Sequence, residues 1–238
     1  MKKGKLHLTA YFLLLAAVVL MIPSLVAQSG GTQLGLQVFH PVIVLVLVMG
    51  WGLIFLCSKS SLDFAYKTAC IALGCGLLLI AVQPIMNGYD ESEHLFKVIA
   101  SLDGKGLRYE DYNYEISDSF FTLRSLRGNG WWGAAANIPW SDGTTFADAL
   151  TYGRAQPTYP VWGYLFSIIG VGLTRLLHAP LFLIYLAGKV TNLIGFVCLG
   201  TLAMKLTPKY KTIFAVFMCM PGTLFVVSSY HCDSTTYG

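Results

Sequence analysis

The sequence predicts an all-α, polytopic membrane protein whose acidic residues are gathered in one long loop outside the membrane. Hydrophobic residues make up 55% of the 238-residue chain and charged residues only 12%, about half the charge of an ordinary soluble domain. Several apolar runs reach the ~18–20 residues that a helix needs to cross the hydrocarbon layer. Ten of the twelve Asp and Glu residues lie between residues 87 and 159. No basic stripe on a soluble fold is evident, which excludes a nucleic-acid-binding protein.

The first 67 residues are expected to form a two-helix hairpin ahead of the rest of the protein. Apolar runs over 8–27 and 36–57 are long enough to span the membrane, and the lysines near the start favour a cytoplasmic N-terminus. A secretory signal peptide would begin in the same way. The run over 8–27 is long for the apolar core of such a peptide, so we expect an uncleaved span.

The remaining chain, residues 68–238, is expected to form one membrane module. A span over 68–86 leads into an outer loop over 87–178. Between residues 109 and 159 the loop is rich in Gly, aromatic and acidic residues and shows no clear periodicity. Its tryptophans and tyrosines form either an interfacial aromatic belt or a platform for a sugar ring or lipid headgroup.

An amphipathic helix is predicted near 90–103, directly after the span. Its apolar residues recur at helical spacing, so the helix is expected to lie along the membrane interface. Asp90 can cap this helix, with Glu93 three residues later as the capping-box partner.

The apolar segment near 160–177 decides the topology. If it crosses the membrane, the lysines that follow the next span lie outside. The bias of Lys and Arg toward cytoplasmic loops instead favours a second juxtamembrane helix, or a shallow re-entrant helix, on the outer side. Spans over 180–206 and 211–230 then return the chain to the outer face, where Asp233 joins Asp90. The sequence stops five residues later without a polar tail, so we expect a truncation at 238 of a longer parent protein.

Asp90, Glu91 and His94 form the sharpest candidate site of the sequence. A carboxylate where a span leaves the membrane can act as a general base toward a hydroxyl acceptor or can bind a divalent cation. Glu91 and His94 are the candidate ligands for Mg²⁺ or Mn²⁺. The pattern lacks the two histidines, four residues apart, of zinc proteases, so zinc hydrolysis is not expected. The six cysteines fit neither a disulfide framework nor a metal knuckle and are expected to fill helix interfaces.

Lys189 lies inside the span over 180–206, where an ionisable residue is costly and points to a function. It could bind a lipid phosphate, neutralise a loop carboxylate, or snorkel to the headgroups. Arg175, near the outer headgroups, is a further candidate for binding a phosphate. Arg124, Arg127 and Arg154 could do the same, although a solvated surface is the simpler explanation for each arginine of the loop.

Four stretches carry a resemblance to a known family. They are Gly88-Tyr-Asp-Glu-Ser-Glu-His-Leu-Phe-Lys97, Pro157-Thr-Tyr-Pro160, Gly188-Lys-Val-Thr-Asn-Leu193, and Met220-Pro-Gly-Thr-Leu-Phe225 followed by Ser228-Ser229 and Asp233. Their order and spacing resemble those of a family of bacterial polytopic membrane proteins whose first loop opens with Pro-x-Asp-Glu-x-x-His. The resemblance covers residues 87–238.

That family is similar to the GT-C superfamily of membrane glycosyltransferases. The similarity implies an acidic catalytic motif in the first outer loop, matched by Asp90 and Glu91, and a second catalytic aspartate after a later span, matched by Asp233. It also implies two juxtamembrane helices and a polyprenyl-phosphate sugar donor. The candidate ligands of the donor phosphate are Lys189, Arg175 and Arg154. The superfamily has later spans that enclose the donor, and this sequence does not contain them.

The expected function is an inverting sugar transfer from a polyprenyl-phosphate donor to a cell-wall or surface-glycan acceptor. The reaction would take place at the outer face of a bacterial plasma membrane, with membrane lipid around the spans. Two alternatives stay open. One is a transporter or flippase of lipid-linked sugars, a class that places charged sites near the midplane on broken helices. The other is a non-catalytic membrane subunit that presents the outer loop to a partner protein.

Overall fold

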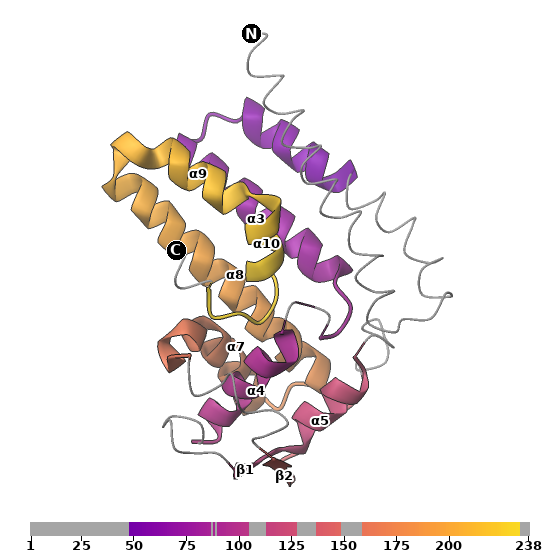
Figure 1. Cartoon of the computed structure of the whole chain (residues 1–238). Helices are drawn as coiled ribbons and strands as arrows, with labels where there is room; N and C mark the ends of the chain where they lie inside the picture. Colours follow the sequence, from indigo (N-terminus) through magenta and orange to yellow (C-terminus); the bar gives the residue numbers. More distant parts are fainter. Residues whose placement is uncertain are drawn as a thin grey trace.

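The computed structural model describes residues 48–86, 88, 90–104, 113–127, 137–148 and 159–233, and these residues are predominantly helical (Figure 1). The predicted span over 8–27, most of the predicted span over 36–57, and Arg154 lie outside the described residues. The first described element is a short apolar helix, Val48–Lys59.

Two helices are long and apolar enough to cross a membrane, α3 (Phe64–Val82) and α8 (Leu181–Leu206), and they pack against each other. Both lie where the sequence predicts spans. α3 begins before the predicted residue 68 because Asp63 caps it and accepts a hydrogen bond from the backbone N–H of Ala65. α8 begins directly after Pro180. The length and composition of these helices are those of a helical membrane protein.

The predicted single span over 211–230 is wrong in one respect, because it is broken into two helices. α9 (Lys211–Cys219) and α10 (Pro221–Val227) are bent by 66° at Met220. Pro221 disfavours helical backbone in the residue before it, and Met220 accordingly has extended backbone with ψ of 126°. The pair counts as a third crossing only when the two helices are taken as one broken span.

Helices occupy both segments in which the sequence predicts juxtamembrane helices. α4 (Glu91–Leu102) follows the exit from α3, and α7 (Leu165–Leu176) follows a 3-10 turn, η2 (Val161–Tyr164). The 12 residues of α7 extend about 18 Å, well short of the ~30 Å hydrocarbon core. α7 packs on α8 and α4. Phe166 at its start lies against Gly195, and Gly170 lies against Ala187, so α7 runs back along the first half of α8.

The prediction of an all-α protein is wrong for a small part of the outer loop. β1 (Asn113–Ser117) pairs antiparallel with β2 (Thr144–Asp148), and α5 (Asp118–Ser125) follows β1 directly. The hydroxyl of Ser117 donates to the carbonyl oxygen of Ser141 at 2.9 Å, which ties the two strands together at one end. Local periodicity does not reveal such a ribbon, because its strands are distant in sequence.

Two hydrophobic cores meet in the middle of the protein. One lies between α3, α8, α9 and α10 and includes Leu79 and Phe196. The other lies among α4, α5, α7 and the first turns of α8, and includes Phe96 and Phe120, whose rings meet edge to face at 5.1 Å. Figure 1 shows the long helices in the upper part, with α4, α5, α7 and the ribbon below. The end of α3, the start of α4 and the segment after α10 lie between the two parts.

Gly170 lets α7 pack closely against α8. A Cβ at this position would lie 2.5 Å from the carbonyl oxygen of Ala187 on α8, so the backbones would have to separate. We therefore expect Gly170→Ala to lower the free energy of unfolding by about 1–3 kcal/mol, seen as a lower Tm in detergent. Gly172→Ala on the same helix is the control, because its Cβ would meet only the flexible end of the Leu102 side chain, at 3.1 Å. Equal Tm values for the two variants would contradict the close packing.

Candidate functional site

The chain leaves α3 through a buried turn that side chains hold in place. α3 ends at Val82, since the backbone of the next residue, Gln83, is extended and a proline follows it. Met86 has left-handed backbone (φ 52°), and its N–H donates to the hydroxyl of Tyr185 on α8 at 2.9 Å. The N–H of Gly88 donates to Glu91 Oε2 at 2.7 Å. The start of α4 therefore has a defined position relative to α8.

Glu91, the first residue of α4, forms a buried ion pair with Lys189 of α8. Lys189 Nζ lies 3.2 Å from Glu91 Oε1, and the two side chains are 1% and 0% exposed. Tyr185 donates its hydroxyl to the same carboxylate oxygen at 2.7 Å, and Lys189 donates to Gln83 Oε1 at 2.9 Å. Three roles were open for Lys189, and in the structure it neutralises a loop carboxylate, that of Glu91. Snorkelling is wrong, because the side chain is enclosed.

The enclosure of this pair changes the roles expected of its members. Glu91 is not placed to act on a substrate, and Lys189 is not placed to contact a donor phosphate. The predicted pairing of Glu91 with His94 around a metal ion also differs from the structure. Groups of Gly88, Tyr185 and Lys189 bind the Glu91 carboxylate, while His94 lies with other ligands. We assign Glu91 and Lys189 to positioning the turn between α3 and α4.

Asp90 lies exposed at the start of α4, next to the buried pair. Its backbone is left-handed (φ 49°, ψ 21°), and its side chain makes no capping hydrogen bond. The predicted capping box is therefore wrong, because a capping residue has extended backbone that turns its side chain toward the helix N–H groups. A left-handed aspartate carries some strain, and such strain gathers at functional sites. The Asp90 carboxylate remains accessible to a substrate.

The segment after α10 brings Asp233 to the same place. Asp233 Oδ2 lies 3.2 Å from His231 Nδ1, and the His231 ring centroid is 4.3 Å from that of His94 on α4. Burial lowers the pKa of His231, and the carboxylates of Asp233 and Asp90 oppose this change. Both carboxylates thus act on the pKa of one imidazole, in line with the prediction that Asp90 and Asp233 lie near each other.

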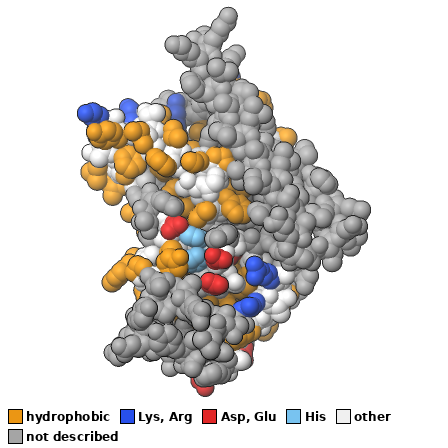
Figure 2. Space-filling view, in the orientation of Figure 1, with side chains coloured by type: hydrophobic (Ala, Val, Ile, Leu, Met, Phe, Trp, Pro, Cys, Tyr) orange, Lys and Arg blue, Asp and Glu red, His pale blue; other side chains and the backbone are white. Residues whose placement is uncertain are grey.

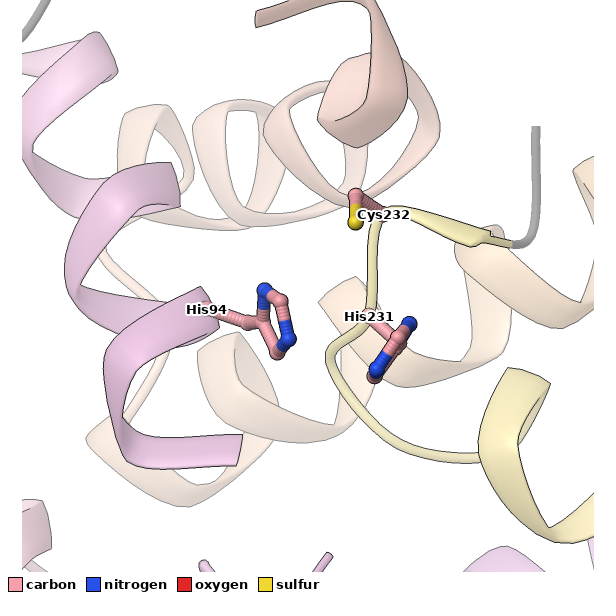
Figure 3. Close-up of side chains that lie close together, drawn as sticks. All are labelled: His94, His231 and Cys232. Carbon is pink, nitrogen blue, oxygen red and sulfur yellow. The ribbon is translucent and has the colours of Figure 1, made fainter. Parts of the chain in front are cut away.

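His94, His231 and Cys232 form a compact cluster. One ring nitrogen from each histidine and the Cys232 Sγ all lie within 4.8 Å of one another, and Figure 3 shows the three side chains in the space between α4 and the segment after α10. His94 Nδ1 also lies 2.7 Å from the hydroxyl of Tyr164. The pKa of His94 is lowered to about 3, mainly by burial and to a lesser extent by the neighbouring His231. The pKa of Cys232 is raised to about 11, mainly by burial and to a lesser extent by the carboxylate of Asp233.

Two arginines of α5 and the turn that follows it lie on the same side of the protein. Burial and Asp90 raise the pKa of Glu93, and Arg124 and Arg127 oppose this change. Figure 2 shows acidic and histidine side chains together on one face, with basic side chains beside them. From the sequence, Arg124 and Arg127 are only two of several candidates for binding a phosphate. Their approach to α4 depends on tertiary packing and cannot be read from the sequence.

Arg175 lies elsewhere. It forms ion pairs with Asp103 and Asp142, and its guanidinium lies 5.0 Å from the ring centre of Trp140. These residues line a cavity of about 840 Å³. Asp103 directly follows the 12-residue helix α4, about 18 Å along the axis from Asp90. Arg175 is therefore not part of the group around Asp90.

An apolar cavity of about 540 Å³ opens beside Asp233, between α8, α9 and α10. Asp233 is the one charged residue in its described lining. The other lining residues are Phe196, Phe214, Phe217, Met220, Gly222, Thr223 and Val226. An occupant of this cavity would be apolar along its length and polar at the end that meets Asp233.

The buried ion pair yields a stability test. Lys189→Met leaves the Glu91 carboxylate buried without its counter-charge, and we expect a loss of about 3–5 kcal/mol in the free energy of unfolding. The double variant Lys189→Met/Glu91→Gln removes both charges and should recover most of this loss. Lys205→Met is the control, since Lys205 is exposed at the other end of α8. Thermal unfolding in detergent gives the comparison, and a single variant as stable as the double one would contradict a buried pair.

The comparisons with known proteins bear on the class of this molecule. No curated protein and no solved structure matches the chain. A family model does match, over residues 73–238, and the family is described as a predicted membrane protein, DUF2142. The matched residues include α4, α8 and the segment after α10, and hence every described site residue. The chain belongs to the DUF2142 family of membrane proteins.

Proposed function

We propose that the chain is a membrane glycosyltransferase of the GT-C kind that takes a sugar from a polyprenyl-phosphate donor. The observation that carries this proposal is the placement of Asp90 and Asp233. Two carboxylates distant in sequence share His231 as a neighbour, and one of them lies at the end of an apolar cavity. An amphiphilic donor, with an apolar tail and a reacting sugar phosphate, matches this combination.

The apolar cavity suits the lipid tail of the donor. It is formed by α8, one of the two helices long and apolar enough to cross a membrane, and by the broken pair of α9 and α10. A polyprenyl chain in this cavity would lie among Phe196, Phe214 and Phe217. Its phosphate would then emerge at Asp233, on the side of Asp90. The sugar attached to that phosphate would lie between the two carboxylates.

The chemistry requires a base and a means of stabilising the departing phosphate. Asp90 accepts the proton of an acceptor hydroxyl, whose oxygen forms the new bond to the anomeric carbon from the face opposite the phosphate. The bond between that carbon and the phosphate oxygen breaks, so configuration is inverted and polyprenyl phosphate leaves. Negative charge grows on the leaving oxygen, and cations placed there lower the barrier. Arg124 and Arg127, which act on Glu93 beside Asp90, are the arginines on this side of the structure.

The acceptor is a cell-wall or surface glycan, and the reaction takes place at the outer face of a bacterial plasma membrane. This setting places α4, α5, α7 and the ribbon outside and the N-terminus in the cytoplasm. The lysines at the end of α8 and the start of α9 then lie in the cytoplasm, in agreement with the positive-inside rule.

A transporter of lipid-linked sugars is the second candidate. The 66° bend between α9 and α10 favours it, because transporters bind substrates at interrupted helices. Reconstituted vesicles separate the two functions. A transferase consumes donor only when acceptor is present, whereas a transporter moves intact donor between leaflets without acceptor.

Asp90 provides the direct test of the transferase. Asp90→Asn removes the base, and we expect transfer of a labelled sugar from polyprenyl phosphate to fall about 10²–10⁴-fold. Tm in detergent should change little, since Asp90 is exposed and its side chain makes no capping hydrogen bond. Glu115→Gln, an exposed carboxylate on β1, is the matched control and should keep full activity. Near-normal turnover by Asp90→Asn would remove this residue from the mechanism.

A substitution at Gly222 tests whether the apolar cavity binds the polyprenyl tail of the donor. A Cβ at this position meets no atom within 4 Å, so a side chain there would occupy the apolar cavity. We expect Gly222→Leu to raise the KM for a long polyprenyl donor about tenfold or more and to affect a short-chain donor less. Gly52→Leu is the control, because Gly52 also has no atom within 4 Å of its Cβ and does not line the cavity. Identical KM values in the two variants would exclude this cavity as the tail site.

A further inference from the structure

The cluster of His94, His231 and Cys232 has the geometry of a metal site. Their ligand atoms lie within 4.8 Å of one another. In a tetrahedral zinc site, bonds of about 2.0–2.3 Å place neighbouring ligand atoms roughly 3.3–3.7 Å apart. Side-chain rotations that move each atom by less than about 1 Å would therefore complete such a site. Figure 3 shows that the three side chains already face a common space.

The types of ligand select the metal. Two imidazoles and a thiolate suit zinc, whereas Mg²⁺ and Mn²⁺ favour carboxylate and carbonyl oxygens. The sequence suggests Mg²⁺ or Mn²⁺ with Glu91 as a ligand, but Lys189 and Tyr185 bind that carboxylate. The chemistry of the cluster thus differs from the expectation in both the ligands and the ion.

Neighbouring groups would orient the histidines. The Tyr164 hydroxyl lies 2.7 Å from His94 Nδ1, which leaves Nε2 of that ring to bind an ion. His231 Nδ1 lies 3.2 Å from Asp233 Oδ2 and accepts a hydrogen bond from the backbone N–H of Asp233 at 3.2 Å, so Asp233 fixes the orientation of this ring. A carboxylate or hydroxyl on the far nitrogen is the usual support of a zinc-bound histidine.

We propose that His94, His231 and Cys232 bind a zinc ion that keeps one coordination position open. Three protein ligands and one open position are the pattern of catalytic zinc sites. The open position would face the region of Asp90 and Asp233, where the reaction proposed above needs positive charge for the leaving phosphate. That role rests on the proposed function, whereas the zinc site itself rests only on the three side chains.

Metal binding can be measured without any turnover. The full chain is purified in detergent, stripped with a chelator, dialysed and titrated with Zn²⁺, and bound metal is counted by mass spectrometry. We expect one zinc per chain. Co²⁺ in place of Zn²⁺ should show a thiolate-to-metal charge-transfer band in the near ultraviolet, and Cys232→Ser should lose this band. His94→Gln and Cys232→Ser should each weaken Zn²⁺ binding at least tenfold, whereas Cys198→Ser, an exposed cysteine of α8, should not.

A second measurement needs no variant and so does not depend on variants that fold. Alkylation of the unmodified protein is followed by peptide mass spectrometry with and without Zn²⁺. Zinc should protect Cys232 from alkylation and leave the labelling of Cys70 and Cys198, on the outer faces of α3 and α8, unchanged. Absence of bound zinc, or substantial and equal labelling of Cys232 in both conditions, would overturn the proposal. Zinc binding without sugar transfer would instead keep the site and reject the proposed function.

Discussion

The ion pair between Glu91 and Lys189 is the contact on which the arrangement of the other groups depends. It joins the first residue of α4 to the middle of α8 in a space closed to solvent. Lys189 also binds Gln83 at the end of α3, whose amide in turn donates to the carbonyl oxygen of Phe225 on α10. Four helices are thus connected through two charges. A buried charge without its partner is strongly destabilising, so these helices are coupled at this point.

The coupling explains where the carboxylates of Asp90 and Asp233 lie. Asp90 is held between Gly88 and Glu91, which hydrogen-bond to each other, so its left-handed backbone is imposed from both sides. Asp233 follows α10, which Gln83 ties to the end of α3. The same network therefore positions both acids, although neither takes part in it. A substitution within the network would move Asp90 and Asp233 together.

Much of this arrangement could be predicted from the sequence, and the limits have physical causes. Composition and run length identify α3 and α8, and counting crossings places Asp233 with Asp90. The break at Pro221 carries a visible signal, because proline restricts the residue before it, yet the apolar run hides it. Cys232 could not be recognised as a possible ligand, because it meets His94 only through tertiary structure. The ribbon of β1 and β2 likewise depends on pairing between distant segments.

The structure also separates charges that stabilise from charges that remain available for chemistry. Lys189 places a positive charge beside Gln83 at the exit of α3, but that charge is already matched by Glu91. A phosphate near Asp90 and Asp233 would face two negative charges, so it could bind only if positive charge were supplied from elsewhere. The described surroundings offer two candidate sources of it, the arginines that act on Glu93 and the zinc ion proposed to bind at the two histidines and Cys232. The proposed transfer meets this requirement, because it brings a bound cation and an anionic leaving group together beside the exposed Asp90.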